Sequence, residues 1–411
     1  MHGETVVPSV LALSHAEQRG RLARWTPAAA GRGLVVGDPC YDRLLISRRL
    51  RDAYRRAYGV DDGRRLVFVS STWWSRSSFG SDPGLIARLA AALPVDEYQL
   101  VAALHPSTWA AHGAWQVRAW LAEPLRSGLV LLDPRQGWHT ALLAADLVIG
   151  DHGAVTCYAA GCGIPVVLAA SADEEVIAES VIGQLLRTAP RLRPEGDLRA
   201  QLDDTIARFD PESYAGVRDL ISSEPGRAAA LIRAAGYAAM SLPEPPAPVR
   251  PLPFPPPDRI TRQDPAAAIV TVRTEPGGVR VSRHPAAVAL ERRPPGLTTG
   301  HLVAADDPDG LPWLEAADVI VGRAPQPEDG WAGRTLRSFP GCALAAVPLD
   351  DRRCLVTGRD GARRLFTAGA ALPDAAVLAS VAYTHDAPAG SIPLITPAGV
   401  VTVAWRPVDQ V

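Results

Sequence analysis

The stretch from Leu147 to Leu168, which reads LVIGDHGAVTCYAAGCGIPVVL, constrains the fold more than any other part of the chain. A short apolar run meets the polar turn Gly150-Asp151-His152-Gly153, and a second apolar run ends the stretch. Small residues at 154–160 predict a short helix between them. Strand, turn, helix and strand in this order indicate a parallel βαβ unit. Its polar turn falls at the carboxyl end of a strand, where open α/β sheets bind ligands, and the free amides at the start of the helix favour an anion.

Apolar runs alternate with helix-forming stretches ahead of this unit. The predicted strands are 66–70, 98–104 and 129–132, and the predicted helices are 83–93, 112–126 and 139–145. Strands that are separated by helices of about 10–15 residues indicate a parallel, doubly wound sheet. The predicted fold class is therefore α/β, with a Rossmann-like parallel sheet.

Composition divides the chain into four predicted segments. Residues 1–33 hold one short helix, at 14–24, and too little else for a domain. Residues 34–241 contain the alternating units and further helices after them. Prolines crowd residues 242–259, which predicts a stiff, extended linker. Residues 260–411 carry short runs such as AIVTV, GVRVS and AVAL between Gly and Pro turns, so a mostly β domain is expected there.

The charge balance and the cysteines argue against several classes of function. A net charge of -2 gives no general attraction to nucleic acid or to an anionic membrane. All 42 basic residues are arginine, so lysine chemistry such as a Schiff base is absent. The five cysteines form no CxxC pair, which argues against a zinc site or a disulfide framework. With no signal peptide and no apolar run of about 18 residues, a cytoplasmic protein without an integral membrane segment is expected.

Four short motifs follow one another, each at the end of a predicted strand. They are Gly37–Asp42 (GDPCYD), Ser71–Trp73 (STW), Leu104–Pro106 (LHP) and Ile149–Gly153 (IGDHG). This series resembles the CDP-glycerol glycerophosphotransferase family, with Cys40 and Trp74 where that family has arginine. More loosely, it is similar to nucleotide-sugar enzymes such as the UDP-N-acetylglucosamine 2-epimerases. The resemblance covers about residues 34–240 and implies the C-terminal, nucleotide-binding half of a GT-B fold. Residues 1–33 are then expected to be a remnant of a missing first half.

Loops after three of the predicted strands are expected to bind the nucleotide and its phosphates. Glycines permit close backbone approach, amides and hydroxyls donate hydrogen bonds, and Arg76 supplies the cation. Two carboxylates follow the fifth strand, where such groups bind ribose hydroxyls. The predicted binding residues are Ser71, Thr72, Arg76, Gly150, Asp151, Gly153, Ala154, Val155, Thr156, Glu174 and Glu175.

Two histidines are the candidate catalytic residues. His105 directly follows a strand and precedes a proline that fixes the local turn. As an imidazolium it would stabilise a departing phosphate, and as a neutral ring it would orient an acceptor. His152 lies at the positive end of the predicted helix, which favours its neutral ring. Each residue also has a structural interpretation, in which His105 serves the local fold, His152 caps backbone carbonyls and Asp151 is a helix N-cap.

The sequence therefore predicts a transferase of the GT-B type that binds a CDP- or UDP-linked donor and transfers glycerophosphate or a sugar. Neither a metal nor a cofactor is expected, because helix amides and side chains neutralise the diphosphate. Two alternatives stay open. One is a non-catalytic nucleotide-binding or scaffold protein without an acceptor half. The other is a UDP-sugar 2-epimerase, although such enzymes use carboxylates from both halves. Self-association or a partner protein is also left open.

Overall fold

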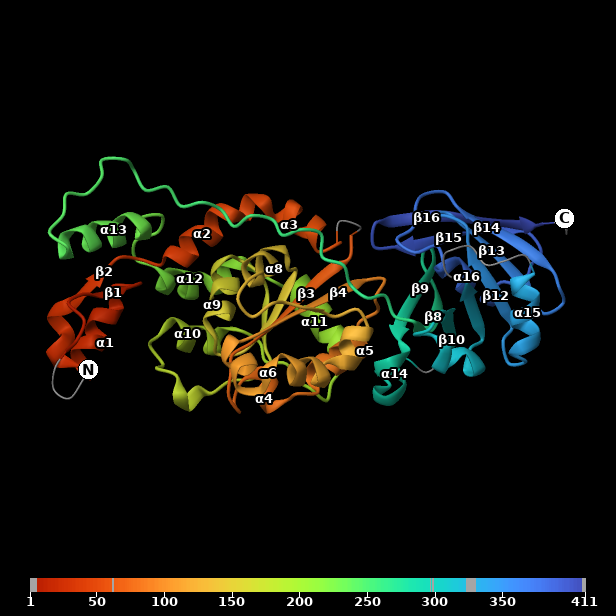
Figure 1. The fold of residues 1–411 in the computed structure, drawn as a ribbon, viewed down its shortest axis with the longest axis horizontal. Helices are drawn as coiled ribbons and strands as arrows, with labels where there is room; N and C mark the ends of the chain where they lie inside the picture. The colour runs from red at the N-terminus through yellow and green to blue at the C-terminus, as the bar shows by residue number, and fades with distance from the viewer. Residues whose placement is uncertain (1–5, 61–62, 296, 298, 323–329, 409–411) are drawn as a thin grey trace.

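The computed structural model describes residues 6–60, 63–295, 297, 299–322 and 330–408. A parallel sheet with helices on both faces occupies the middle of an elongated molecule, and a β-barrel lies at one end (Figure 1). The other end holds the parallel strands β1 (Leu11–Leu13) and β2 (Gly33–Val35), with α1 (Glu17–Trp25) between them in sequence. The described helices include none long and apolar enough for a bilayer crossing.

The central sheet has five parallel strands in the order β5-β4-β3-β6-β7. These are β3 (Arg65–Ser71), β4 (Tyr98–Leu104), β5 (Val130–Leu131), β6 (Leu147–Gly150) and β7 (Val166–Leu168). The chain runs outward from β3 to β5 and then returns to the other side of β3 to form β6. This reversal between β3 and β6 creates the switch point at which open α/β sheets bind ligands. The predicted Rossmann-like parallel sheet is confirmed.

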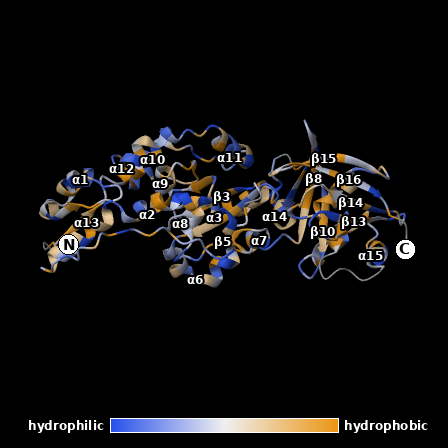
Figure 2. Ribbon diagram, turned by 90° about the horizontal axis from the view of Figure 1, so that it is seen from above, coloured by the Kyte–Doolittle hydropathy of each residue, from blue (hydrophilic) through white to orange (hydrophobic). Residues whose placement is uncertain are grey.

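Alternate residues along the strands supply two separate cores. Phe68 and Val148 pack into one cluster, and their neighbours Val67 and Ile149 pack into the other. The alternation follows from the two-residue period of a strand, and burying a side chain such as Phe68 stabilises the fold by about 1.5–3 kcal/mol. Apolar colour accordingly concentrates on β3 in the interior (Figure 2).

Helices cover both faces of the sheet. One face is covered by α2 (Pro39–Ser47), α3 (Arg51–Ala57), α8 (Trp138–Ala144), α9 (Ala154–Gly161), α10 (Val181–Thr188) and α12 (Ala215–Ile221). The other is covered by α5 (Leu85–Ala92), α6 (Pro106–Trp120), α7 (Ala122–Arg126) and α11 (Leu198–Ala207). The short α4 (Ser78–Ser81) follows the loop after β3, and α13 (Ala228–Ala239) packs at the end of the molecule away from the barrel.

The GDPCYD motif caps helices. Asp38 is the N-cap of α2 and accepts the amide of Tyr41 at 2.8 Å. The buried Asp42 accepts the amides of Gly226 and Ala228 at the start of α13, at 2.6 and 3.0 Å. Both carboxylates therefore satisfy the open N–H groups at helix starts, which locks α2 and α13 in place.

The proline-rich segment is extended, as predicted, and it is also docked along the sheet helices. It leaves α13 and passes over α2 and α3 toward the barrel (Figure 1). Phe254 inserts into the core, where its ring stacks on His139 at 3.9 Å between centroids. Its amide donates to Ser47 and its carbonyl accepts the Tyr54 hydroxyl. We call residues 243–260 the strap, because Leu252, Phe254 and Ile260 contact α2 and α3 of the sheet helices.

The C-terminal part forms a closed barrel of nine described strands, which confirms the mostly β prediction. The strands are β8 (Ala267–Glu275), β9 (Gly278–Pro285), β10 (His301–Asp306), β11 (Val319–Gly322), β12 (Leu344–Pro348), β13 (Arg353–Gly358), β14 (Arg363–Ala368), β15 (Gly390–Thr396) and β16 (Gly399–Pro407). The buried α16 (Val377–Thr384) packs with the barrel core, and α15 (Trp331–Ser338) lies outside.

One predicted β run in this part is wrong. The run AVAL belongs to α14 (Ala286–Arg292), which begins directly after Pro285. Alanines at its start favour helix, and Val288 is buried because this helix packs against α5 of the sheet. Tertiary packing against a surface far away in sequence therefore decided the structure of this segment.

Candidate functional site

Three of the predicted loops meet at one edge of the sheet. Strand register pairs Ser71 with Leu104 and Val69 with Ile149. The residues that follow these strands, Thr72, His105 and Asp151, therefore lie at the same carboxyl edge, at the switch point between β3 and β6. We call this edge, with the loops 72–77, 105–107, 151–155 and 173–175, the rim.

Asp151 ties two loops of the rim together. Its carboxylate, in a residue only 1% exposed, accepts the amide and the hydroxyl of Thr72 and the amide of Ser78, each at 2.9 Å. It is not an N-cap, because the residue before α9 is Gly153 and no side chain caps this helix. The buried charge is compensated by three hydrogen bonds, so Asp151 acts mainly by fixing the loop after β3.

Several predicted ligand contacts turn out to serve this framework. The Ser71 hydroxyl donates to the carbonyl of Thr72 and accepts the amide of Phe79, both at 2.9 Å. A Cβ on Gly153 would collide with Thr72, and one on Gly150 would collide with Thr156. These glycines are therefore required by the close approach of the protein's own side chains. The hydroxyls of Ser71, Thr72 and Thr156 point into the structure, so any ligand contact by these residues would use the backbone.

Two buried polar atoms at the start of α9 lack hydrogen-bond partners within the described residues. They are Nδ1 of the half-buried His152 and Oγ1 of the fully buried Thr156. Buried polar atoms in native proteins are nearly always paired, so each one needs an explanation such as a bound water, ion or ligand. The Thr156 atom lies against Gly150 and is closed off, whereas His152 belongs to the 151–155 turn, which is part of the rim.

His105 lies on the rim and has an exposed ring. Its Nδ1 accepts the amide of Ser107 at 3.1 Å and caps α6, so the side chain has a structural role. An accepting Nδ1 assigns the proton of the neutral ring to Nε2, which is left to contact a ligand. The ring also stacks on Trp73, with 6.4 Å between centroids and 23° between planes. Capping and ligand binding therefore use different atoms of the same side chain.

Trp74, which follows Trp73 in the loop after β3, has a strained backbone. Its φ is +81°, in the left-handed region that a bulky residue avoids at a cost of about 1–2 kcal/mol. The surrounding loop enforces this conformation, since the Trp74 carbonyl accepts the amide and the hydroxyl of Ser77, at 3.2 and 2.8 Å. Gly80 also approaches this carbonyl so closely that a side chain there would collide with it.

The predicted cation and the two predicted carboxylates of the rim contact one another. Arg76 forms ion pairs with Glu174 and, at 3.1 Å, with Glu175. A backbone hydrogen bond and then Arg76 lower the pKa of Glu174. Because all three side chains are exposed, their pairing contributes little to stability and leaves them open to exchange partners with a ligand. The loops after β3 and β7 therefore lie together, through a pairing of Arg76 with the two glutamates that the sequence prediction did not foresee.

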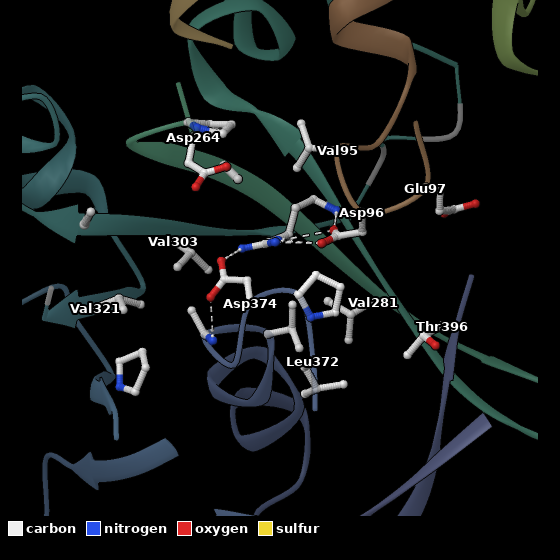
Figure 3. Close-up of a pocket in the computed structure, with 18 of the residues that line it drawn as sticks. Val95, Asp96, Glu97, Asp264, Val281, Val303, Val321, Leu372, Asp374 and Thr396 are labelled. Carbon is white, nitrogen blue, oxygen red and sulfur yellow. Dashed lines mark hydrogen bonds and ion pairs between the residues drawn. The ribbon is translucent and has the colours of Figure 1, made fainter. Parts of the chain in front are cut away.

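A cavity of about 440 Å³ lies between the sheet helices and the barrel (Figure 3). Its apolar wall includes Val281, Val303 and Val321, and its polar wall includes Arg283 with Asp96 and Asp374. Arg283 binds Asp96 at 2.7 Å and also pairs with Asp374. Burial alone would lower the pKa of Arg283, but the two carboxylates outweigh it and raise that pKa. We call this contact the junction.

The junction was missed by sequence reasoning because its partners are 187 residues apart and show no motif. Two more cavities, of about 510 and 520 Å³, lie beside α11 and beside the arginines of 48–51. None of these three cavities is lined by the predicted rim residues. Within the described residues, no cluster of His, Cys, Asp and Glu could hold a metal ion.

No family model matches this chain, and no curated protein matches it in sequence. Solved structures similar to part of it include the wall teichoic acid polymerase TagF, at 13% identity over 57% of this chain and 58% of that chain, with a TM-score of 0.40. A glycosyltransferase from Rickettsia africae ESF-5 is 11% identical over 57% and 63%, with a TM-score of 0.33. Anabaena Alr3699/HepE in complex with UDP-glucose is 16% identical over 57% and 64%, with a TM-score of 0.32. The chain spans less than two thirds of the length of each, and the likeness is one of fold alone.

Proposed function

We propose that this protein binds a nucleoside-diphosphate-linked donor, CDP- or UDP-based, at the rim, as the nucleotide-binding half of a GT-B-type transferase. The observation that carries the proposal is the unpartnered Nδ1 of His152 beside the start of α9, at the switch point of the sheet. Helix amides and a histidine together offer hydrogen bonds to a diphosphate without a metal. The motifs that follow β3, β4 and β6 agree with this proposal.

The chemistry assigned to the rim is the binding and stabilisation of a diphosphate leaving group. Amides of Gly153, Ala154 and Val155 would bind phosphate oxygens at the start of α9, and the Nδ1–H of His152 would donate a further hydrogen bond. His105 would donate from Nε2 to the same diphosphate or to the acceptor. Arg76 would exchange Glu174 for a phosphate oxygen as the donor binds, because an arginine–phosphate pair is a strong, bidentate contact.

Calorimetry with CDP and UDP tests this proposal directly. Saturable binding of at least one nucleotide is expected from the full-length protein, and His152→Ala is expected to weaken it about tenfold, as for the loss of a hydrogen bond to a charged group. His112→Ala removes an exposed histidine of α6 and serves as the matched control with unchanged affinity. No heat and no thermal shift with either nucleotide would disprove the proposed function.

A non-catalytic nucleotide-binding protein is the second candidate function. The pairing of Arg76 with both Glu174 and Glu175 favours it, because the cation is neutralised where leaving-group stabilisation would need it. The two candidates differ in turnover. Release of CDP or UDP from CDP-glycerol or UDP-glucose, lost in His105→Ala, supports the transferase, and binding without release supports the non-catalytic protein.

A further inference from the structure

The loop after β3 presents two exposed tryptophans between two anchored ends. Asp151 binds Thr72, which precedes the tryptophans, and Ser78, which follows them. Arg76, between Trp74 and Ser78, pairs across the rim with Glu174 and Glu175. Neither indole makes a hydrogen bond to another described residue, and Trp73 is 48% and Trp74 72% exposed. Large apolar rings at such exposure lie next to the proposed phosphate site and contribute little to the core.

The two rings form a corner. Their centroids are 5.3 Å apart and their planes meet at 72°, so one ring stands nearly upright on the other. Trp73 is backed by the ring of His105, which holds it in place. A planar ligand ring could stack on one indole while its edge meets the other, which is the pair of geometries that aromatic rings prefer.

The strained backbone fixes the direction of the second wall. The left-handed φ of Trp74 is enforced by the Ser77 hydrogen bonds and by the approach of Gly80. Backbone strain that is over-determined by its surroundings gathers at ligand-binding sites, where it positions a side chain in advance. The strain here holds an exposed indole, which packs no core and is positioned for a partner from outside.

The corner is also close to the predicted phosphate amides. Thr72, the residue just before Trp73, is the neighbour that a side chain on Gly153 would strike, and Gly153 immediately precedes α9. We propose that Trp73 and Trp74 form a stacking platform for the base of the nucleotide whose diphosphate binds at α9. This inference rests on the proposed function and assigns the base subsite of that same site.

Affinity for a ligand with a base, compared with one without, tests the platform. Calorimetry would compare CDP and UDP with inorganic pyrophosphate on the full-length protein. Stacking of one base on an aromatic side chain predicts that either nucleotide binds about tenfold or more tightly than pyrophosphate. Trp74→Ala should remove that advantage and leave pyrophosphate binding unchanged, while Trp74→Phe should keep most of it.

Trp115→Ala is the matched control, because Trp115 is 78% exposed on α6 but lies outside the loop. It should change neither affinity. Equal binding of CDP and pyrophosphate by the unmodified protein would overturn the platform and leave the phosphate site standing. A loss of pyrophosphate binding in Trp74→Ala would show that Trp74 only shapes the loop, which also overturns the platform. Failure of all three ligands to bind would overturn the platform together with the proposed function.

Discussion

The rim and the junction are both polar surfaces, but they differ in how completely their buried polar atoms are hydrogen-bonded. At the junction, Arg283 binds two carboxylates, and its carbonyl accepts the amide of Val95 at 3.0 Å. At the rim, His152 has a buried nitrogen without a partner in the described residues, and Trp74 has a strained backbone. A surface that is built only for stability satisfies its groups, so the difference gives the junction a structural role and supports the proposal of ligand binding at the rim.

Removal of Arg283 should have the largest effect on stability. Arg283→Ala removes the guanidinium that pairs with Asp96 and Asp374 where the loop before β4 meets the barrel. We expect the free energy of unfolding to fall by about 3–5 kcal/mol, as for one partner removed from a buried ion pair. Urea unfolding measures it, with Arg352→Ala on an exposed barrel turn as the control. A loss below about 1 kcal/mol would place the junction among ordinary surface contacts.

Asp151→Ala should come next, because it removes three hydrogen bonds to one buried carboxylate. The free energy of unfolding is expected to fall by about 2–3 kcal/mol, and the loop of Trp73 and Trp74 should lose its order. Limited proteolysis near residue 75 would detect the loosened loop. Asp133→Ala, at a turn where the carboxylate accepts one exposed amide, is the control. If the variant is as stable as the unmodified protein and its loop resists proteolysis, Asp151 does not hold the rim together.

Acid should weaken the docking of the strap through His139. Burial, and then Arg43, lowers the pKa of His139 from 6.5 to about 4. The unfolded chain therefore binds more protons between these values, and stability is complete above pH 6.5 and falls as the pH drops toward 4. The loss at pH 5 should be on the order of 1 kcal/mol, discounted for partial exposure. Thermal unfolding from pH 7.5 to 4.5 tests this, and His139→Phe should flatten the slope.

Arg76→Gln should have the smallest effect on stability and a larger one on binding. An exposed ion pair contributes about 0–1 kcal/mol, so the melting temperature should hardly move. Nucleotide affinity should nevertheless fall if this arginine reaches the diphosphate. The opposite result would be a destabilised protein with unchanged nucleotide affinity. Arg76 would then have a structural role, like Arg283 at the junction, and the proposed difference between the two surfaces would be wrong.

Local sequence pattern was sufficient for the sheet. The apolar run of β4 matches its predicted bounds, Tyr98–Leu104, and the motifs after β3, β4 and β6 meet at one edge because parallel strands place their carboxyl ends together. The local pattern could not predict contacts between residues that are far apart in the sequence. Arg283 with Asp96, and Phe254 between prolines, carry no local signal of a partner. The hydroxyl of Thr156 was predicted to face a ligand, but the helix turns it toward Gly150. The type of a residue tells which chemistry its side chain can perform, whereas the direction in which the side chain points depends on packing in the folded protein.

The course of the strap suggests how the protein would behave if it were cut. The chain leaves α13 at the end far from the barrel and returns along the sheet helices (Figure 1). A nick before Phe254 would give a C-terminal fragment that still carries this phenylalanine, together with Val288 and Arg283. That fragment would keep three separate attachment points on its former partner. Two independently expressed fragments should therefore reassemble by complementation, with the peptide connection serving mainly to raise their local concentration.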